Sequence, residues 1–375
     1  MEIMRSGVLF RNPLPGHRAI IAYAPHVLSL GNREFLAEFR HGQAIYSPDG
    51  EIHQVRSLDN GNTWQHEGPV LDRNEDTSPH NYRAGHLTRL RDQRLVLKIN
   101  RAAQPDPNRL YFNPDTGGLS HCETLYLTSL DDGHSWQPPV IANFPELPVG
   151  LEPAADGPVI ELASGSWMQV IETWKSYDND GPPCNWTYAV FSSDEGRTWT
   201  DPTDIANGTD HDRAYSHASF TTLPDGTMQC LLWTGNLAMD EFYDLHMVQS
   251  VDPNRRVWTK PLGTGIPGQT SALAVLPDAR RAVAYSHRDN TDQPGIKLIV
   301  SDDGQHWDTS APLVLWDAYG KEALGVPRTD SYPGAHDAIA YGAPQLVAIG
   351  DNELLASFWC TQSSDTHARY VRICE

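Results

Sequence analysis

Cysteines and basic residues are both scarce in this sequence of 375 residues. Lysine and arginine total 28 against 48 aspartates and glutamates, which gives a formal net charge of -20 at pH 7. Because nucleic-acid binding needs a basic surface that neutralises phosphates, we expect no nucleic-acid partner. The cysteines are odd in number and include no Cys-x-x-Cys pair, so we expect reduced thiols rather than a disulfide framework or a zinc site. They are Cys122, Cys184, Cys230, Cys360 and Cys374.

Long apolar runs and cofactor motifs are missing as well. No stretch approaches the ~20 apolar residues that a membrane-spanning helix needs, and residues 1–13 lack the apolar core of a secretory signal peptide. We therefore expect a cytoplasmic protein with no membrane partner; the sequence specifies no oligomeric state. The chain has no glycine-rich phosphate loop and no His-x-x-x-His or cysteine cluster. We therefore expect neither a cofactor nor a bound metal.

A short pattern, Ser-x-Asp-x-Gly-x-Ser/Thr-Trp, is the most informative feature that the chain does contain. It occurs at Ser57–Trp64, Ser129–Trp136 and Ser192–Trp199. Eroded copies keep Asp302, Gly304 and Trp307 in one place and Ser250, Asp252 and Trp258 in another. The aspartate can accept backbone N–H groups inside a hairpin turn, the glycine supplies a positive φ, and the tryptophan packs between sheets. We interpret the aspartates as structural turn residues: Asp59, Asp131, Asp194 and Asp302.

A second unit, two apolar runs joined by a short turn, is typical of a β-hairpin. Its six copies are Val27–Phe39, Leu87–Ile99, Val159–Trp174, Phe220–Trp233, Leu273–Tyr285 and Leu346–Trp359. Five of them precede a copy of the turn pattern, which would lie between two further strands. We therefore predict an all-β fold, a single six-bladed β-propeller domain over residues 1–375 with four-stranded antiparallel blades. The sixth blade is expected to join Ala368–Cys374 to an N-terminal strand near Gly7–Arg11.

The loops opposite the turn patterns are the expected location of a ligand site. On that face each innermost strand begins and each second strand ends. Aromatic rings, arginines, imidazoles and carboxylates recur there, and these groups suit sugar rings and their hydroxyls. The predicted substrate-binding residues are Tyr23, Arg40, Tyr82, Arg83, His86, Arg101, Glu172, Tyr215, Trp233, His287 and Arg288. Tyr332, His336 and Asp337 precede the innermost strand of the last blade.

The turn pattern resembles the Asp-box (BNR) repeat of sialidases and their relatives, and the resemblance covers nearly the whole chain. It implies a sialidase-like propeller and a carbohydrate substrate. Sialidases of this fold open blade one with Arg-Ile-Pro, whose arginine belongs to a carboxylate clamp. Here Tyr23-Ala24-Pro25 stands in that slot, and Trp233 stands where blade four has another arginine. Arg288 could supply one guanidinium, but a typical sialidase is not expected.

Other positions match the family pattern and define the predicted catalytic residues. Asp49 stands where the family places its acid/base, and Tyr341 stands where it places its nucleophilic tyrosine. His217 falls near the place of the glutamate that activates that tyrosine, although Glu152 or Glu172 could reach the same pocket.

Three functions remain open at this stage. The first is an exo-acting glycoside hydrolase on a small oligosaccharide, acidic ones included, that uses two carboxyls drawn from Asp49, Glu152, Asp156 and Glu172. The second is a lyase that cleaves uronic-acid glycans by β-elimination, with Arg40, Arg83 or Arg101 neutralising the uronate. Its candidate acids and bases are His26, Tyr82, His86, Tyr215 and His217. The third is a non-catalytic propeller that binds glycan or protein.

Overall fold

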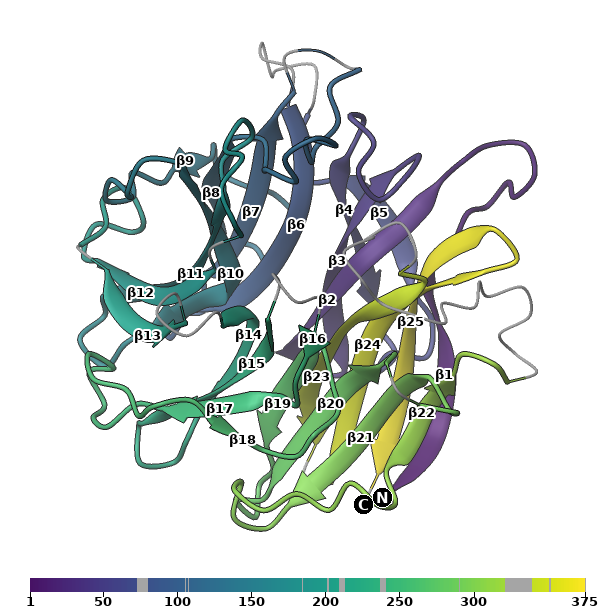
Figure 1. Cartoon of the computed structure of the whole chain (residues 1–375). Helices are drawn as coiled ribbons and strands as arrows, with labels where there is room; N and C mark the ends of the chain where they lie inside the picture. Colours follow the sequence, from purple (N-terminus) through teal and green to yellow (C-terminus); the bar gives the residue numbers. More distant parts are fainter. Residues whose placement is uncertain are drawn as a thin grey trace.

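The computed structural model describes residues 1–72, 80–104, 106, 108–183, 185–200, 202–208, 213–236, 241–289, 291–320, 339–350 and 352–374. Over these ranges the regular elements are all β-strands, which form six antiparallel sheets around a common centre (Figure 1). The structure confirms the predicted six-bladed propeller. No helix within the described ranges is long and apolar enough to cross a membrane.

Blades one to three each contain four consecutive strands. Blade one consists of β2 (Ile21–Gly31), β3 (Glu34–Gly42), β4 (Glu51–Ser57) and β5 (Gln65–Pro69). Blade two consists of β6 (His80–Arg89), β7 (Leu95–Ala103), β8 (Cys122–Ser129) and β9 (Val140–Ile141). Blade three consists of β10 (Leu151–Glu161), β11 (Trp167–Lys175), β12 (Trp186–Ser192) and β13 (Thr203–Asn207).

Blade four has one additional short strand. Its main path is β14 (Ala214–Thr222), β15 (Met228–Asn236), β17 (His246–Gln249) and β18 (Leu262–Gly263), and β16 (Glu241–Phe242) pairs with the end of β15. Blade five consists of β19 (Ser271–Val275), β20 (Arg281–His287), β21 (Gly295–Ser301) and β22 (Leu313–Asp317). Each of the six predicted hairpins therefore lies within the first two strands of a blade.

Blade six is built from both ends of the chain. Its inner strands are β23 (Tyr341–Gly350), β24 (Glu353–Gln362) and β25 (Asp365–Cys374), and its outer strand is β1 (Glu2–Phe10). The register of β1 on β25 runs from Glu2 opposite Cys374 to Phe10 opposite Ala368. Figure 1 shows the two termini side by side. The prediction that the chain ends meet in one blade is confirmed.

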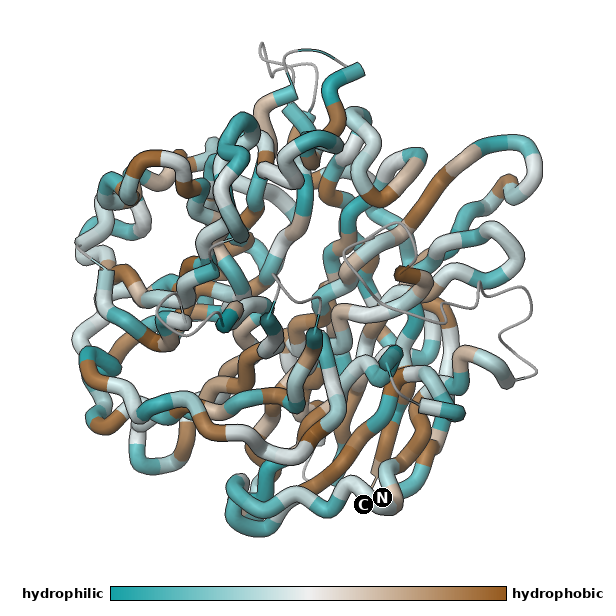
Figure 2. Tube along the Cα trace, in the orientation of Figure 1, coloured by the Kyte–Doolittle hydropathy of each residue, from teal (hydrophilic) through white to brown (hydrophobic). Residues whose placement is uncertain are grey.

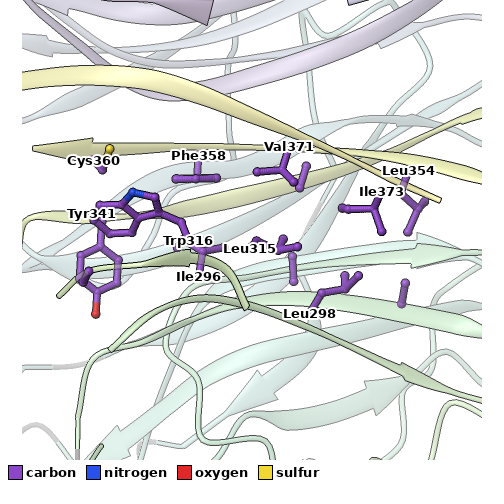
Figure 3. Close-up of a cluster of buried hydrophobic side chains, with 14 of the residues drawn as sticks. Ile296, Leu298, Leu315, Trp316, Tyr341, Leu354, Phe358, Cys360, Val371 and Ile373 are labelled. Atoms are coloured by element: carbon purple, nitrogen blue, oxygen red, sulfur yellow. The ribbon is translucent and has the colours of Figure 1, made fainter. Parts of the chain in front are cut away.

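The ring closes through contacts between neighbouring innermost strands, from β2 through β6, β10, β14, β19 and β23 back to β2. Apolar side chains fill the space between adjacent blades. Between blades five and six, Ile296 and Leu298 of β21 pack in one cluster with Leu354 and Phe358 of β24 (Figure 3). Figure 2 shows the hydrophobic residues along the strands and hydrophilic residues on many connecting loops. Burial between sheets therefore accounts for the apolar runs of the hairpins.

The complete turn patterns close the hairpins between the third and fourth strands of blades one to three. In the second copy, Asp131 accepts the Ser135 N–H at 2.9 Å and the Ser135 hydroxyl at 2.6 Å. The Gly133 N–H donates to the Ser129 hydroxyl oxygen. The other two copies make the same bonds. The bonds from Ser135 lower the pKa of Asp131 to about 2.

Blade five corrects one predicted turn residue. Asp303, rather than Asp302, accepts the hydroxyl of Ser301 and the backbone N–H groups of Gln305 and His306. In the complete copies the glycine N–H reaches a serine four residues earlier, whereas Gly304 reaches Ser301 three residues earlier. In every copy the bonded aspartate follows the serine by two residues, as Asp131 follows Ser129. In blade five the residue two after Ser301 is Asp303, which therefore makes the bonds of the turn.

The cysteines agree with the expectation of free thiols. Cys122, Cys230 and Cys360 are buried and Cys374 is half-buried, and none of these four forms a disulfide. Cys184 lies outside the described residues.

Candidate functional site

Ionisable side chains from the first two strands of blades one to four gather near the propeller axis. We call this group the axial cluster. It consists of His26 of β2, Glu38 of β3, His86 of β6, Lys98 of β7, Asp156 of β10, Glu172 of β11 and His217 of β14. Because these strands follow one another around the ring, residues far apart in the sequence face a common space.

Asp156, Glu172 and His217 form the open end of the axial cluster. One side-chain ligand atom from each lies within 4.8 Å of those of the other two. The two carboxyls are half-buried and the imidazole is exposed. Burial raises the pKa of Glu172; the His217 charge opposes this rise and the Asp156 charge adds to it. A carboxyl with a raised pKa beside a second carboxyl is an arrangement that favours acid catalysis.

Two β-bulges set the direction of these side chains. The register of β10 on β11 shifts after Asp156, where Gly157 has a φ of 64°. The register of β14 on β15 shifts between Ser216 and Ser219, where His217 has a φ of 48°. A histidine in this left-handed region is uncommon. The bulge directs the His217 backbone N–H to Glu172 Oε2 at 2.9 Å, and such bulges often re-aim side chains next to active sites.

Lys98 connects the open and closed ends of the axial cluster. It is 1% exposed, and its ammonium donates a hydrogen bond to the Ala155 carbonyl at 2.9 Å. Burial lowers the pKa of Lys98 to about 8, although the nearby carboxyls of Asp156, Glu38 and Glu172 act in the opposite direction. A cation near three carboxyls compensates part of the repulsion between them.

The closed end contains His26, His86 and Glu38. The two imidazoles lie 5.2 Å apart between ring centroids, and His26 Nδ1 accepts the backbone N–H of Leu87. Burial lowers the pKa of His26 to about 4 and that of His86 well below its ordinary value. Burial raises the pKa of Glu38 well above its ordinary value. The two imidazoles are therefore neutral near pH 7, and His26, predicted to be catalytic, accepts a hydrogen bond from the backbone of β6.

Packed aromatic rings border the open end. The His217 ring stacks on Trp233 with centroids 5.4 Å apart and an interplanar angle of 24°. Phe242 packs against Trp233 with centroids 5.4 Å apart. Trp233 itself is buried, whereas the His217 ring is exposed and could stack on a sugar ring. Of the predicted binding residues, Glu172 and Trp233 therefore lie together at one place with His217.

Two arginines predicted to bind substrate have structural roles instead. Arg40 is fully buried and donates to the carbonyls of Tyr82, Ala44 and Ser47. Arg83 is nearly buried, donates to the Ile45 carbonyl, and lies over the rings of Tyr46 and Tyr111 at 4.3 and 4.2 Å. Their guanidinium groups therefore organise the loop between β3 and β4, and neither arginine belongs to the axial cluster.

That loop carries Asp49, the predicted acid/base. Asp49 is half-buried and accepts the Gln43 N–H at 3.3 Å. Burial by itself would raise the pKa of Asp49, but hydrogen bonds from Ser47 and Gln43 and the charge of Arg40 together lower it. Asp49 is therefore an ionised carboxylate held by its own loop, and lacks the raised pKa of a proton donor at neutral pH.

Tyr341, the predicted nucleophile, belongs to the hydrophobic core. It is 5% exposed, packs against Trp316, and donates its hydroxyl to the His287 carbonyl at 2.8 Å. Figure 3 shows its ring beside Trp316 in the cluster between blades five and six. Burial raises the pKa of Tyr341 far above its ordinary value. Arg288 donates two hydrogen bonds to the Tyr341 carbonyl. Tyr341 and Arg288 therefore both bond to the backbone, and neither is a member of the axial cluster.

The other predicted residues of blades two and three pair locally. Glu152 lies 3.0 Å from His121, which it holds at a raised pKa. Arg101 pairs with Glu123 at 2.8 Å. Neither pair includes a member of the axial cluster.

Four further predicted positions are spread around the ring. Tyr23 packs against Trp359 with ring centroids 4.7 Å apart, and Tyr82 is buried. Tyr215 is also buried, with its ring 5.9 Å from that of His246. The Lys297 ammonium donates a hydrogen bond to His287 Nδ1 at 2.9 Å, and burial lowers the pKa of His287 to about 4. Tyr332, His336 and Asp337 lie outside the described residues.

Solved structures share this architecture over the whole chain. A protein of unknown function from Dyadobacter fermentans has a TM-score of 0.71 and 21% identity, with 99% of this chain and 98% of that chain covered. An alpha-L-arabinanase from Penicillium chrysogenum, complexed with arabinobiose, has a TM-score of 0.66 and 14% identity over 100% and 99% of the two chains. A mutant NanB sialidase from Streptococcus pneumoniae has a TM-score of 0.63 and 13% identity over 98% and 70%.

The chain has the sialidase-like six-bladed propeller fold. No protein-family model matches the sequence, and no curated protein matches it either.

Glu38 and Lys98 are site residues that the sequence analysis did not single out. Each interrupts an otherwise apolar hairpin run, Glu38 between Ala37 and Phe39 and Lys98 between Leu97 and Ile99. A charged residue at such a position must be compensated where the strand is buried. That signal was present in the sequence, but it does not reveal that the two residues share one space with Asp156 and Glu172.

Proposed function

We propose that the chain is a glycoside hydrolase that acts on a small oligosaccharide, with Glu172 as proton donor and Asp156 as the second carboxylate. The observation that carries the proposal is the pairing of a half-buried Glu172, at raised pKa, with Asp156 inside the axial cluster. Support at the level of fold comes from sialidase and arabinanase structures. Glycosidases use two such carboxyls on either side of the scissile bond.

The chemistry follows from the two environments. Protonated Glu172 would donate its proton to the glycosidic oxygen as the bond to the anomeric carbon breaks. Asp156 would attack that carbon and form a glycosyl-enzyme, which water then hydrolyses with Glu172 acting as base. One oxygen of each carboxyl lies within 4.8 Å of the other, which is shorter than the ~6.5 Å or more of inverting enzymes. We therefore propose retention of configuration.

Substrate selection is expected to differ from that of a sialidase. The open end of the axial cluster presents the exposed ring of His217, which stacks on the buried Trp233, while Arg40, Arg83 and Arg288 donate to backbone carbonyls. Aromatic stacking recognises the faces of sugar rings without requiring a carboxylate. A short neutral oligosaccharide is therefore the first substrate class to test, followed by acidic ones.

The test is to screen the purified protein against short glycans by release of reducing ends, then to compare variants on the best substrate. Glu172→Gln and Asp156→Asn should each lower kcat by about 10²–10⁴-fold, the usual contribution of acid–base catalysis. Glu161→Gln, at the other end of β10 where Glu161 accepts the Arg91 N–H, is the matched control and should keep full activity. Full turnover in both active-site variants would refute the assignment, and glycan binding without turnover would favour a binding protein.

A second candidate is β-elimination of a uronic-acid glycan. Its support is the Tyr215–His246 ring pair at 5.9 Å, with Arg213 close enough to influence the pKa of both side chains. A tyrosine and a histidine beside a guanidinium could supply acid, base and carboxylate neutralisation. This reaction yields an unsaturated product that absorbs ultraviolet light, whereas hydrolysis does not.

A further inference from the structure

Three histidines and a glutamate converge on one face of blade one, on strands β3, β4 and β5. We call this group the outer histidine cluster; it consists of His41, Glu51, His53 and His66. His53 Nδ1 lies 2.9 Å from His66 Nε2, and His53 Nε2 lies 3.0 Å from Glu51 Oε2. The rings of His41 and His53 stack with centroids 4.0 Å apart and an interplanar angle of 5°. The cluster shares no residue with the axial cluster.

The strand register explains why these side chains meet. His41 pairs directly with Glu51 across β3 and β4, and His53 follows Glu51 by two residues on the same face. His66 pairs with Val55 on the neighbouring strand. In the sequence only Glu51 and His53 are neighbours, as a Glu-x-His pair. His41 and His66 join them only because the three strands pair in the sheet.

The donor set suits a transition metal. One ligand atom each from His41, Glu51 and His53 lies within 4.8 Å of the other two, and His53 is only 6% exposed. Two imidazoles and one carboxylate favour zinc-like divalent ions, whereas Ca²⁺ and Mg²⁺ prefer all-oxygen sites.

We propose that His41, Glu51 and His53 bind a divalent transition-metal ion of the Zn²⁺ class, with water completing the coordination. His66 would be the supporting residue: with the metal on His53 Nε2, the remaining ring proton resides on Nδ1 and is donated to His66 Nε2. Metal-bound histidines commonly use their second nitrogen in this way. Phe10 of β1 packs on His66 with centroids 4.7 Å apart and would shield this side of the site.

The proposed metal site lies at the base of a loop, so a bound metal would affect the stability of the fold. His41 and Glu51 are the pair that closes the loop of residues 43–50, which carries Asp49. A metal held by both would tie the base of that loop to β4. Metal binding should therefore raise the unfolding temperature, because an ion that binds only the folded chain stabilises it.

The experiment uses the whole chain, stripped with a chelator that is then removed. Zn²⁺ titration by calorimetry should show one site per chain, and saturating Zn²⁺ should raise the unfolding temperature while Ca²⁺ and Mg²⁺ should not. His53→Gln and His41→Gln should each weaken Zn²⁺ binding at least about tenfold, since removing a group that only supports a metal ligand already costs about 10–100-fold. His134→Gln, at an exposed position in a turn, is the matched control. Circular dichroism checks that each variant folds.

Co²⁺ provides a direct readout of coordination. Wild-type protein with Co²⁺ should give visible absorption bands of a protein-ligated ion, and His53→Gln should lose them. The proposal is overturned if no saturable Zn²⁺ binding occurs. It is also overturned if binding survives in both His41→Gln and His53→Gln but is lost in His217→Gln, because the metal would then lie at the axial cluster.

Discussion

Glu38 is a buried carboxyl near the centre of the propeller. It is 1% exposed, and neither carboxyl oxygen has a hydrogen-bond partner among the described residues. A buried ion with so little compensation is costly, so the protonated form is favoured and the pKa of Glu38 rises well above its ordinary value.

This environment predicts a pH-dependent effect of Glu38→Gln. Because the folded-state pKa is raised, the stability contributed by protonated Glu38 is present below the unfolded pKa of ~4.3 and is lost as the pH rises through the folded value. Glutamine imitates the protonated carboxyl and does not titrate. The unfolding temperature of the variant, relative to wild type, should therefore increase from about pH 5 to about pH 8. A difference that stays constant over this range would contradict the prediction.

At the scale of the element, the adjacent residues Asp302 and Asp303 in the turn between β21 and β22 have different roles. Asp303 accepts the Ser301 hydroxyl and two backbone N–H groups, and its Oδ2 also lies 2.6 Å from His306 Nδ1. The bond from the His306 N–H is the first cause of its lowered pKa. These bonds satisfy backbone donors that a hairpin turn leaves without a partner on the strands.

Asp303→Asn should therefore lower the unfolding temperature, whereas Asp302→Asn should leave it nearly unchanged. The pair differs by one position and keeps the side-chain size, so the comparison isolates the hydrogen bonds. Thermal unfolding at neutral pH measures both variants. An equal loss in the two would mean that either aspartate can serve the turn, and the assignment of Asp303 would fail.

At the scale of the whole molecule, the ring depends on β1 joining blade six. Leu9 of β1 is 4% exposed and belongs to the core cluster that contains Phe39 of blade one and Tyr370 of β25. Met4 of the same strand is 58% exposed. One strand therefore offers a buried and an exposed position for the same type of truncation.

Leu9→Ala should lower the free energy of unfolding by about 2–5 kcal/mol, the usual effect of removing a buried leucine side chain. Met4→Ala should change it by about 0.5 kcal/mol or less, as is usual for surface substitutions. Denaturant unfolding provides both values. Equal stability of Leu9→Ala and wild type would show that β1 does not close the ring in solution.

The candidate site was only partly predictable, and particular residues show why. Glu172, His217 and Trp233 were expected on one face of the ring and they do meet there. Arg40 and Tyr341 occupy similar positions at strand ends, but Arg40 donates to the next blade and Tyr341 enters the core. Position along a strand specifies the face of the ring, whereas the direction of each side chain depends on bulges and on neighbouring blades.

The sequence by itself determined the blades, because each hairpin and each turn is encoded by residues close together in the chain. Apolar runs specify the strands, and serine, aspartate and glycine specify the turns through local hydrogen bonds. The tertiary structure alone decided which ionisable groups share a space. Asp156 and Glu172 lie near Lys98 and Glu38, and His41 lies near His53, only because the strands pair and the blades close into a ring. Their burial and their pKa values follow from that closure.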